Sequence, residues 1–415
     1  MTSARLTVAI VADLLEERWP SMDLMADMLM THSGSNGTGF SPALLRPEFG
    51  SALSSVMRQD PAEAPPTIQR IAHRFWSYPR WLRQQQPADV YHIVDHSYAH
   101  LSHALPAGRV VVTCHDIDAF RALLPGGQRE STLPRMLVKR VLTGLQRAAV
   151  IVCDSEATRS ELLSNDLVPA DRVSVVPIAV HPACTAAPDH ESDTTAAALT
   201  GKLGAADLLH VGSTIARKGI DTLLEVLARV AEARPDVKLW RVGGPFTEAQ
   251  TALACRLGVT GRIVVLPFVT RPVLAALYRR AAMVLLPSQR EGFGLPVIEA
   301  MACGTPILCS DLPVLREVGG DAAEYCSPGD PKEWSARIIT LLSEREGAPA
   351  QWHARQGACV AHASQFSWDR YASEMHAVYG SVAQSARSMT PSGGTDQTTP
   401  SGGTHQMTAS GSPGQ

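Results

Sequence analysis

The feature of this chain that most constrains its fold is a regular alternation of short apolar runs with longer amphipathic stretches. Several of the runs are apolar throughout, as strands buried in a parallel sheet are. Helical patterns such as Ile220–Glu232 and Pro272–Ala282 lie between them. Alternating β and α elements predict parallel sheets with helices on both faces. The predicted strands are Leu6–Ala12, Val90–Ile93, Val110–Thr113, Val150–Cys153, Val173–Val176, Asp207–Val211, Lys238–Val242, Arg262–Leu266, Met283–Leu286 and Pro306–Cys309.

The series of strands is interrupted between His181 and Thr200 by a small, polar, proline-containing segment that is typical of a linker. A chain of 415 residues is long enough for about two or three domains. We therefore predict two doubly wound domains, residues 1–183 and residues 184–370. A ligand is then expected in the cleft between them, at the carboxyl ends of the strands.

The C-terminal segment, residues 385–415, consists mainly of Ser, Gly, Thr, Pro and Gln, and the pentapeptide PSGGT at 391 recurs at 400. Such a segment cannot bury enough apolar surface to offset the entropy lost on folding. We predict that it is a disordered tail.

The composition excludes some classes of function. With 37 basic and 40 acidic residues the net charge is −3, which gives no electrostatic argument for binding nucleic acid. The eight cysteines include no CxxC pair, so we predict no metal site and reduced core thiols. An export signal and an apolar run of ~20 residues are both missing from the sequence. A cytoplasmic protein is therefore expected.

The most informative motif is EGFGLPVIE at 291–299, in which two carboxylates flank a glycine-containing turn that leads into an apolar helix. The start of a helix offers free N–H groups and a partial positive charge. Gly292 and Gly294 allow the backbone to come close to a ligand. At ~3.6 residues per turn, Glu291 and Glu299 lie roughly on one side of a helical segment. The motif therefore suits a sugar attached to a nucleotide diphosphate, with one acid at each end of the ligand.

Fixed positive charge is needed where such a ligand loses its diphosphate. Arg217 and Lys218 are candidates, because Arg binds phosphate as a fork and Lys as a point charge. His115 ends an apolar strand, which places it at the carboxyl edge of the first predicted sheet. Each signal taken alone is also compatible with a solvated or structural side chain.

Five segments occur in the order and spacing of a known family. These segments are VTCHD at 112–116, HVGSTIARKG at 210–219, RVGG at 241–244, EGFGLPVIEAMACGTPILCS at 291–310 and FSWDRY at 366–371. Together they resemble the retaining glycosyltransferases of family four, whose signature is a pair of glutamates separated by seven residues. Many members of that family separate the arginine and lysine that are adjacent here.

The resemblance implies a GT-B fold. This is an α/β architecture of two doubly wound, Rossmann-like domains that face a cleft, with a C-terminal helix crossing back to the first domain. It makes residues 1–183 the acceptor side and residues 184–370 the nucleotide-sugar side. Residues 371–384 would then end the crossover helix.

The resemblance also implies roles for individual residues. Glu291 would accept hydrogen bonds from the donor sugar, Glu299 would bind the ribose, and the diphosphate would lie toward Lys218 and Arg217. His115 would form a hydrogen bond to the sugar near its anomeric carbon. The expected catalytic residues are His115, Glu291, Arg217 and Lys218. The expected donor-binding residues are Gly212, Arg217, Lys218, Gly292, Phe293, Gly294, Leu295 and Glu299.

The activity that the resemblance implies is transfer of a hexosyl group, with retention, from a nucleotide diphosphate sugar to a glycan or lipid-linked acceptor in cell-surface polysaccharide synthesis. SQREGFGLPVIEAMACGTPI at 288–307 is similar to bacterial mannosyltransferases of polysaccharide assembly, so GDP-mannose is the first expected donor and UDP-glucose the second. No cofactor is expected. A covalent intermediate and front-face attack both remain open. The alternatives are a GT-B sugar-nucleotide epimerase and a non-catalytic nucleotide-sugar-binding protein.

The first half of the chain is less typical of the family. DLLEERWPSM at 13–22 replaces a common glycine-rich turn, and PIAV at 177–180 replaces the commoner Pro-Asn-Gly-Val. Acceptor binding is therefore the least defined part of the predicted site.

Two clusters in the first half have alternative interpretations. RIAHRFWSYPRWLR at 70–83 is basic and aromatic, and with Arg135–Arg140 it predicts contact with the inner leaflet of a membrane, unless its aromatic side chains lie in the core. His92, His96, His100 and His103 are spaced so that three rings could share a helix face, in principle as metal ligands. We expect them to be structural, because GT-B chemistry generally needs no metal.

Overall fold

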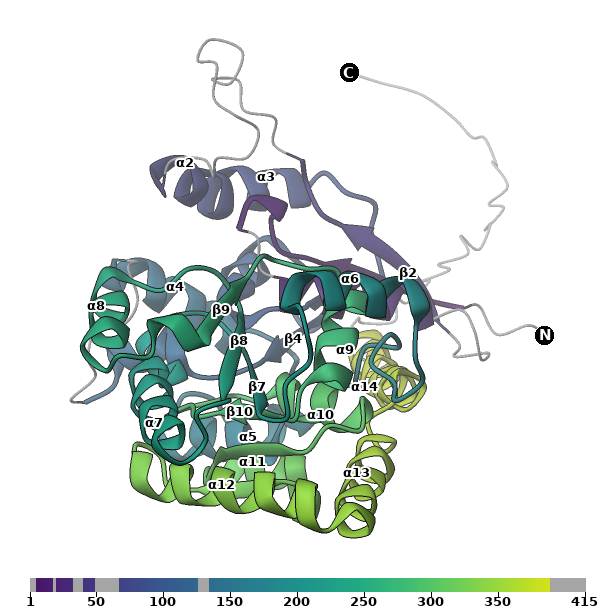
Figure 1. The fold of residues 1–415 in the computed structure, drawn as a ribbon. Helices are drawn as coiled ribbons and strands as arrows, with labels where there is room; N and C mark the ends of the chain where they lie inside the picture. Colours follow the sequence, from purple (N-terminus) through teal and green to yellow (C-terminus); the bar gives the residue numbers. More distant parts are fainter. Residues whose placement is uncertain (1–4, 18–19, 33–39, 49–66, 126–133, 389–415) are drawn as a thin grey trace, which may run out of the picture.

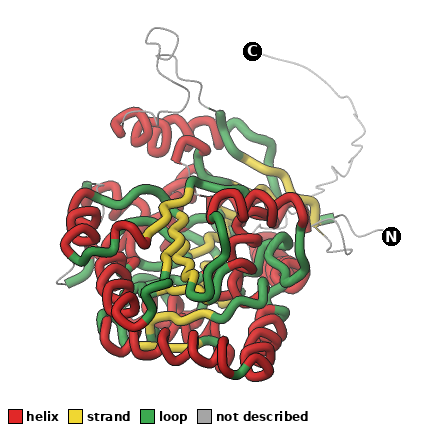
Figure 2. Tube along the Cα trace, in the orientation of Figure 1, coloured by secondary structure: helices red, strands yellow, loops and turns green. Residues whose placement is uncertain are grey.

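The computed structural model describes residues 5–17, 20–32, 40–48, 67–125 and 134–388. These residues form two parallel sheets of six strands each (Figure 1). Figure 2 shows the strands surrounded by helices and loops. The α/β class with two doubly wound sheets, predicted from the alternation of elements, is confirmed.

The first sheet contains one strand that the sequence pattern did not predict. Its strand order is β2-β1-β3-β4-β5-β6, and every pair is parallel. The missed strand, β2, lies at the edge and contains Pro42. Proline cannot donate to a neighbouring strand, so it obscures a strand in the sequence but is tolerated at an edge. The bounds are β1 (Leu6–Val11), β2 (Phe40–Leu45), β3 (Val90–Ile93), β4 (Val110–Cys114), β5 (Val150–Cys153) and β6 (Val173–Val175).

The second sheet has the order β12-β11-β10-β7-β8-β9 and is also parallel throughout. Its edge strand β12 was missed because it has only three residues and one of them is charged. The bounds are β7 (Asp207–Val211), β8 (Lys238–Val242), β9 (Ile263–Leu266), β10 (Met283–Leu286), β11 (Ile307–Ser310) and β12 (Glu324–Cys326).

Helices connect the strands of both sheets. The first domain contains α1 (Pro20–His32), α2 (Thr67–Ala72), the π-helical turn η2 (His73–Ser77), α3 (Tyr78–Leu82), η3 (His96–Ala104), η4 (Asp118–Leu123), α4 (Arg135–Gln146) and α5 (Glu156–Ser164). The second contains η6 (Ala216–Lys218), α7 (Ile220–Ala233), α8 (Glu248–Arg256), α9 (Arg271–Arg280), α10 (Leu295–Ala302), α11 (Pro313–Gly319), α12 (Pro331–Gly347) and α13 (Pro349–Ala363). Shorter 3-10 turns are η1 (Leu15–Glu17), η5 (Ala170–Arg172), η7 (Thr260–Arg262) and η8 (Gly320–Ala322).

The segment predicted to be a linker is only partly one. Its second half forms helix α6 (His190–Thr200), which packs against α9. Asp189 caps this helix by accepting a hydrogen bond from the Ser192 N–H, and the alanine-rich sequence that follows favours helix. The prediction of a linker through Thr200 was therefore wrong, because small polar residues also make good caps and helix surfaces.

The last helix that the structure describes crosses back to the first domain, as expected. The last helix, α14 (Trp368–Ser388), packs against α1, β3 and β4. The Tyr379 hydroxyl lies 2.7 Å from Nδ1 of His92, which joins this helix to the interior of the first sheet. Because α14 ends at Ser388, the first residues of the predicted disordered tail are helical, and the rest of the tail lies outside the described residues.

A continuous apolar core joins the two domains. It runs from Val8 and Ile10 of the first sheet, through Tyr371 of α14, to Val284 and Leu286 of the second sheet. In the parts of the chain that the structure describes, none of the helices is long and apolar enough to span a membrane.

Candidate functional site

Of the two glutamates of the motif, Glu291 precedes helix α10 and Glu299 lies within it, and Glu291 has the predicted basic neighbours. Oε1 of Glu291 accepts hydrogen bonds from Nζ of Lys218 at 2.6 Å and from Oγ of Ser288 at 2.7 Å. Oε2 lies 3.3 Å from Nη1 of Arg217. The fold therefore brings together the three side chains that the sequence singled out from two distant segments.

The charge of Glu291 is stabilised by these neighbours. The side chain is only 6% exposed, and burial by itself would raise its pKa. The charges of Lys218 and Arg217, with hydrogen bonds from Lys218 and Ser288, outweigh burial, so the pKa of Glu291 lies below its usual value. Glu291 is therefore an anion that forms ion pairs with Lys218 and Arg217 in this structure.

Backbone contacts between two loops fix this arrangement. The Gln289 N–H donates to the Arg217 carbonyl at 2.7 Å, which ties the loop after β10 to η6. Gly219 then begins α7 in the left-handed region, with φ of 66°, and a Cβ there would lie 2.1 Å from the Pro287 carbonyl oxygen. Only glycine fits such a close approach of two chain segments.

Arg217 also reaches the other domain. Its Nε lies 3.0 Å from Oδ2 of Asp118, and its Nη2 lies 3.9 Å from Oδ2 of Asp116. Burial opposes its charge, but Glu291, Asp116 and Asp118 together raise the pKa of Arg217. The sequence placed Arg217 on a diphosphate and missed both aspartates, although Asp116 directly follows His115.

Glu299 is held inside the second domain. Its side chain is 3% exposed, Oε1 lies 3.1 Å from Nη1 of Arg271, and Oε2 accepts from the Tyr278 hydroxyl at 2.9 Å. Both partners come from α9, and neither was predicted as part of the site. The expectation that a buried carboxylate needs partners is met by Arg271 and Tyr278, and the predicted contact of Glu299 with a ribose remains a prediction.

His115 does not have a free ring nitrogen. Its Nδ1 lies 2.5 Å from Oδ2 of Asp154, and its Nε2 lies 2.8 Å from the carbonyl oxygen of Val94. Both partners are acceptors, so both ring nitrogens must carry protons. Burial would lower the pKa of His115, but Asp154, Asp95 and the Val94 carbonyl raise it to about 10.

The predicted hydrogen bond from the His115 ring to a sugar therefore has no nitrogen to make it in this structure. The ring is instead a buried imidazolium, and the backbone of the same residue lies against Gly292 of the motif. The cause is Asp154, at the end of β5, which the sequence pattern did not link to His115.

The glycine-containing turn lies at the contact between the domains. A Cβ at Gly292 would lie 1.8 Å from the His115 carbonyl oxygen, and the Gly292 carbonyl accepts from the Ser155 and Thr158 hydroxyls at 2.9 and 3.0 Å. Gly294, with φ of 94°, is the N-cap of α10, and Leu295 is the first residue of that helix. Within this first turn Pro296 has no N–H and the Val297 N–H donates to the Gly294 carbonyl at 2.8 Å, which leaves the Leu295 N–H for an anion.

Two further predicted donor-binding residues have different surroundings. Phe293 is buried and contacts the edge of the Phe366 ring, with the ring centres 5.9 Å apart. Gly212 follows β7, and a Cβ there would lie 3.9 Å from Cδ of Lys218. Gly212 is thus next to the basic pair, while the Phe293 side chain packs between segments rather than facing the cleft.

The histidine cluster is divided among separate partners. His92 lies 2.7 Å from both the Tyr379 and the Thr113 hydroxyls, and His100 lies 2.9 Å from the Arg74 carbonyl oxygen. Within the described residues, the structure has no group of three histidine, cysteine or acidic side chains that could hold a metal ion.

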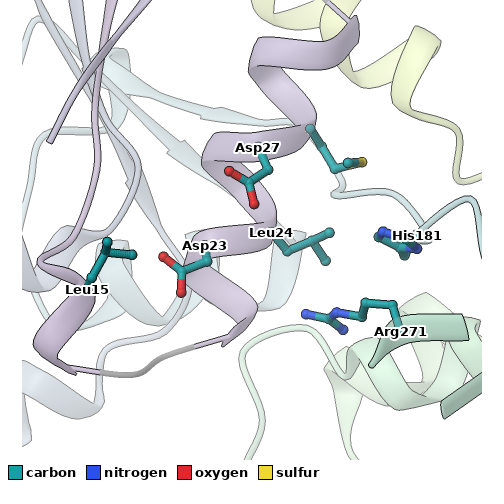
Figure 3. Close-up of a pocket in the computed structure, with 7 residues that line it drawn as sticks. Leu15, Asp23, Leu24, Asp27, His181 and Arg271 are labelled. Atoms are coloured by element: carbon teal, nitrogen blue, oxygen red, sulfur yellow. The ribbon is translucent and has the colours of Figure 1, made fainter. Parts of the chain in front are cut away.

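A cavity of about 450 Å³ lies between α1 and the start of α9 (Figure 3). It is lined by Asp23, Leu24 and Asp27 of the first domain and by Arg271 of the second. Because Arg271 also holds Glu299, this cavity is adjacent to the second glutamate of the motif. The lining of this cavity comes from both domains and carries acidic and basic groups, but it includes none of the predicted catalytic residues, which are His115, Arg217, Lys218 and Glu291.

Two family models match the chain. The model described as Glycosyltransferase Family 4 matches residues 38–183, and the model described as Glycosyl transferases group 1 matches residues 193–355.

Relatives with curated names match different lengths of the chain. It is 32% identical to O-antigen chain mannosyltransferase B of Escherichia coli, over 63% of this chain and 67% of that protein. It is 38% identical to the D-inositol 3-phosphate glycosyltransferase of Segniliparus rotundus, over 41% of this chain and 38% of that protein. The match thus spans less than half the length of the inositol phosphate enzyme.

Solved structures share the whole architecture. Sucrose-phosphate synthase from Thermosynechococcus elongatus superposes with a TM-score of 0.72 at 16% identity, covering 92% of this chain and 100% of that one. WaaG, a glycosyltransferase involved in lipopolysaccharide biosynthesis, superposes with a TM-score of 0.64 at 16% identity, covering 90% of this chain and 99% of that one. At such low identity this likeness shows the fold alone, and that fold is GT-B.

Proposed function

The chain belongs to the glycosyltransferases of family four, and on that premise we propose that it transfers a hexosyl group from a nucleotide diphosphate sugar to a glycan or lipid-linked acceptor. The observation that carries the proposal is the cluster of Lys218, Arg217 and Glu291 beside the start of α10. A departing diphosphate needs fixed positive charge, and preorganised charge is often the largest contribution to catalysis.

The same cluster suggests how the donor is held. Lys218 and Arg217 are paired with Glu291, so an incoming diphosphate competes with this carboxylate for the two cations. Once Glu291 is displaced from them, its oxygens can accept hydrogen bonds from the hydroxyls of the donor sugar. The Leu295 N–H at the start of α10 supplies a further donor to the anion.

We propose a mannosyl donor first, and a role in cell-surface polysaccharide synthesis. The similarity to an O-antigen chain mannosyltransferase over most of its length supports both. GDP-mannose is the donor to test first and UDP-glucose the second. The solved structure of HepE from Anabaena, which superposes with a TM-score of 0.66 at 16% identity, contains UDP and glucose, which keeps UDP-sugars in the panel.

A second candidate acceptor is a phosphorylated polyol. The D-inositol 3-phosphate glycosyltransferases match the chain at up to 38% identity, although over less than half of their length. Inositol phosphate therefore belongs in the acceptor panel beside glycans and lipid-linked sugars.

The experiment that tests the proposal is a thermal-shift panel of nucleotide sugars, followed by turnover assays on each ligand that stabilises the protein. We expect GDP-mannose or UDP-glucose to raise Tm, because a ligand that binds only the folded state stabilises it. Release of the nucleoside diphosphate, with transfer to an acceptor, would support the glycosyltransferase. Stabilisation without turnover on any acceptor would favour a nucleotide-sugar-binding protein, and interconversion of the free nucleotide sugar would favour an epimerase.

We also propose that the first domain docks on an anionic membrane. The basic aromatic segment forms α2, η2 and α3, with Phe75, Tyr78 and Leu82 in the core but Trp76 and Ile68 64% and 83% exposed. Part of the segment therefore lies in the core, and the proposal rests on Trp76 and on Ile68, which lies just before the segment.

A second helix of the first domain adds exposed apolar and basic side chains to the proposed surface. Helix α4 exposes Met136, and α4 and α3 both pack against η3. The exposed cations on the two segments are Arg80, Arg83, Arg135, Lys139, Arg140 and Arg147. Exposed apolar side chains among cations fit the interface of a membrane that contains anionic lipids.

Charge reversal on this surface is expected to weaken sedimentation with vesicles of phosphatidylglycerol and phosphatidylcholine. Each cation near such a surface contributes about 1 kcal/mol, so Lys139→Glu with Arg140→Glu should reduce the partition coefficient by roughly tenfold or more. Arg256→Glu with Lys332→Glu, on the exposed surface of the second domain, is the charge-matched control. Equal sedimentation of both double variants, or no salt-sensitive binding of the wild type, would contradict the docking surface.

A further inference from the structure

A buried guanidinium without a carboxylate partner lies at the end of β8. Arg241 is 0% exposed, its Nη1 donates to the Gly244 carbonyl, and its Nη2 lies 3.0 Å from the Gly212 oxygen and 3.4 Å from the Gly243 oxygen. Among the residues that the structure describes, no acid pairs with it, and burial lowers its pKa to about 10. Because burying an uncompensated charge is costly, an arginine here indicates a requirement that an apolar side chain does not meet.

The three carbonyl groups belong to two segments that meet at the edge of the second sheet. A Cβ at Gly243 would lie 1.9 Å from the Gly212 oxygen, so the turns after β7 and β8 touch through glycine. The ring of His210, also 0% exposed, lies directly behind Gly212, 3.3 Å from where a Cβ would be. Arg241 therefore donates hydrogen bonds to all three carbonyl groups at the place where the two turns meet.

Holding these carbonyls inward determines where the next amides point. In a planar trans peptide the N–H of one residue points away from the carbonyl of the residue before it. With the Gly212 and Gly243 carbonyls directed at Arg241, the N–H groups of Ser213 and Gly244 face away from it. In the described part of the chain neither amide donates to another backbone oxygen, and Ser213 is exposed while Gly244 is half-buried.

We propose that Arg241 is a positioning residue for the donor diphosphate, which turns the amides of Ser213 and Gly244 toward the anion beside Lys218. The location supports this, because the Lys218 side chain passes next to Gly212. Two adjacent amides directed at one point form an anion-binding concavity. This inference rests on the proposed function, since it names the part of the donor that these amides recognise.

The test compares nucleoside diphosphates with monophosphates by isothermal titration calorimetry. The wild type, Arg241→Met and Arg241→Lys are titrated with GDP and GMP, and with UDP and UMP. We expect Arg241→Met to reduce the preference for the diphosphate, measured as the ratio of the two dissociation constants, by about tenfold, because charge-directed hydrogen bonds are lost. Arg241→Lys should lose part of this preference, since a single ammonium replaces a fork that spans several carbonyls.

A purely structural arginine would give a different result. Such a role would weaken both nucleotides equally, or lower Tm without changing their ratio, and either outcome would overturn the proposal. Arg280→Met is the matched control, because Arg280 also donates to a carbonyl, that of Gly201 at 2.7 Å, but at the far end of α9 from Arg271. Its ratio should equal that of the wild type.

Failure of this inference can be separated from failure of the proposed function. If the wild type binds neither GDP nor UDP, the proposed function is wrong. If it prefers the diphosphate and Arg241→Met keeps that preference, only the role of Arg241 is wrong. If Arg241→Met shows no cooperative thermal transition, the test rests on Arg241→Lys. An unchanged ratio of the monophosphate and diphosphate dissociation constants in Arg241→Lys would then refute the positioning role.

Discussion

Replacing Lys218 by alanine is expected to lower kcat by about 10²–10³-fold while the fold remains intact, the usual effect of removing a group that stabilises developing negative charge. Lys218 lies 2.6 Å from Glu291, and Arg217, 3.3 Å from the same carboxylate, remains as its partner when Lys218 is removed. The loss should appear in kcat more than in KM, because the charge on the leaving diphosphate develops as the glycosidic bond breaks.

Glu291→Gln is expected to separate binding from turnover. Glu291 neutralises Lys218 and Arg217 in the absence of ligand, and its charge-stabilised form competes with a diphosphate. Without that charge the free nucleoside diphosphate should bind as tightly as before or more tightly. Turnover should still fall by orders of magnitude, since the carboxylate no longer holds the hydroxyls of the sugar.

The measurements are steady-state kinetics with the donor found in the thermal-shift panel and calorimetry with its nucleoside diphosphate. Lys238→Ala is the matched control, because Lys238 is exposed at the start of β8 in the same domain. Its kcat should stay within about twofold of the wild type, as for most surface substitutions. Near wild-type rates for both Lys218→Ala and Glu291→Gln would mean that the chemistry takes place elsewhere.

Asp154→Asn is expected to destabilise the protein by about 3–5 kcal/mol, the usual cost of removing one partner of a buried ion pair. Asparagine has nearly the same shape, so the cost comes from leaving the His115 imidazolium without its carboxylate. Asp154 is 1% exposed and His115 12% exposed, so solvent does not compensate for the loss. Urea unfolding at neutral pH gives the free energy of unfolding of both proteins.

The difference in unfolding free energy between the wild type and Asp154→Asn is expected to depend on pH with a definite sign. The pKa of His115 is raised in the folded state, from 6.5 to about 10. A raised pKa contributes stability that is fully present below about pH 6.5 and is lost as the pH rises toward 10. The gap in stability between wild type and Asp154→Asn should therefore be largest near pH 6 and narrow above pH 7. Taking the difference between the two proteins cancels the titration of the other groups.

Asp369→Asn provides the control for the ion pair. Asp369 lies 3.3 Å from Nδ1 of His32, but it is 60% exposed, and exposed pairs contribute at most about 1 kcal/mol. If Asp154→Asn costs no more than Asp369→Asn, or if the gap does not change with pH, His115 is not a buried imidazolium.

The strands were predictable from sequence because a buried parallel strand must be apolar along its whole length. Val90–Ile93, Val150–Cys153 and Met283–Leu286 have the bounds that the pattern predicted. A strand at the edge of a sheet need not be apolar along its whole length. The pattern therefore missed β2, which contains a proline, and β12, which contains a glutamate. Helix α6 was missed for a related reason, since an exposed helix needs a cap and good helix formers rather than an apolar face.

The members of the candidate site were also predictable, but their partners were not. Lys218 and Glu291 could be paired as candidates across a long stretch of sequence because the segments around them resemble those of one family, and the structure places their side chains 2.6 Å apart. No local pattern links Arg217 to Asp118, or Glu299 to Tyr278, because these pairs depend on how the two sheets and α9 are placed.

The sequence by itself determined two parallel sheets, the glutamate motif before α10 and the basic pair beside it, because strand burial and helix starts leave periodic and local traces. Only the tertiary structure decided which charges meet. It directed Arg217 across the cleft to Asp118, made His115 a cation by placing Asp154 against it, and buried Arg241 against three carbonyls. Coulomb interactions depend on distance and on the surrounding dielectric, and both are set by packing between segments that are far apart in the chain.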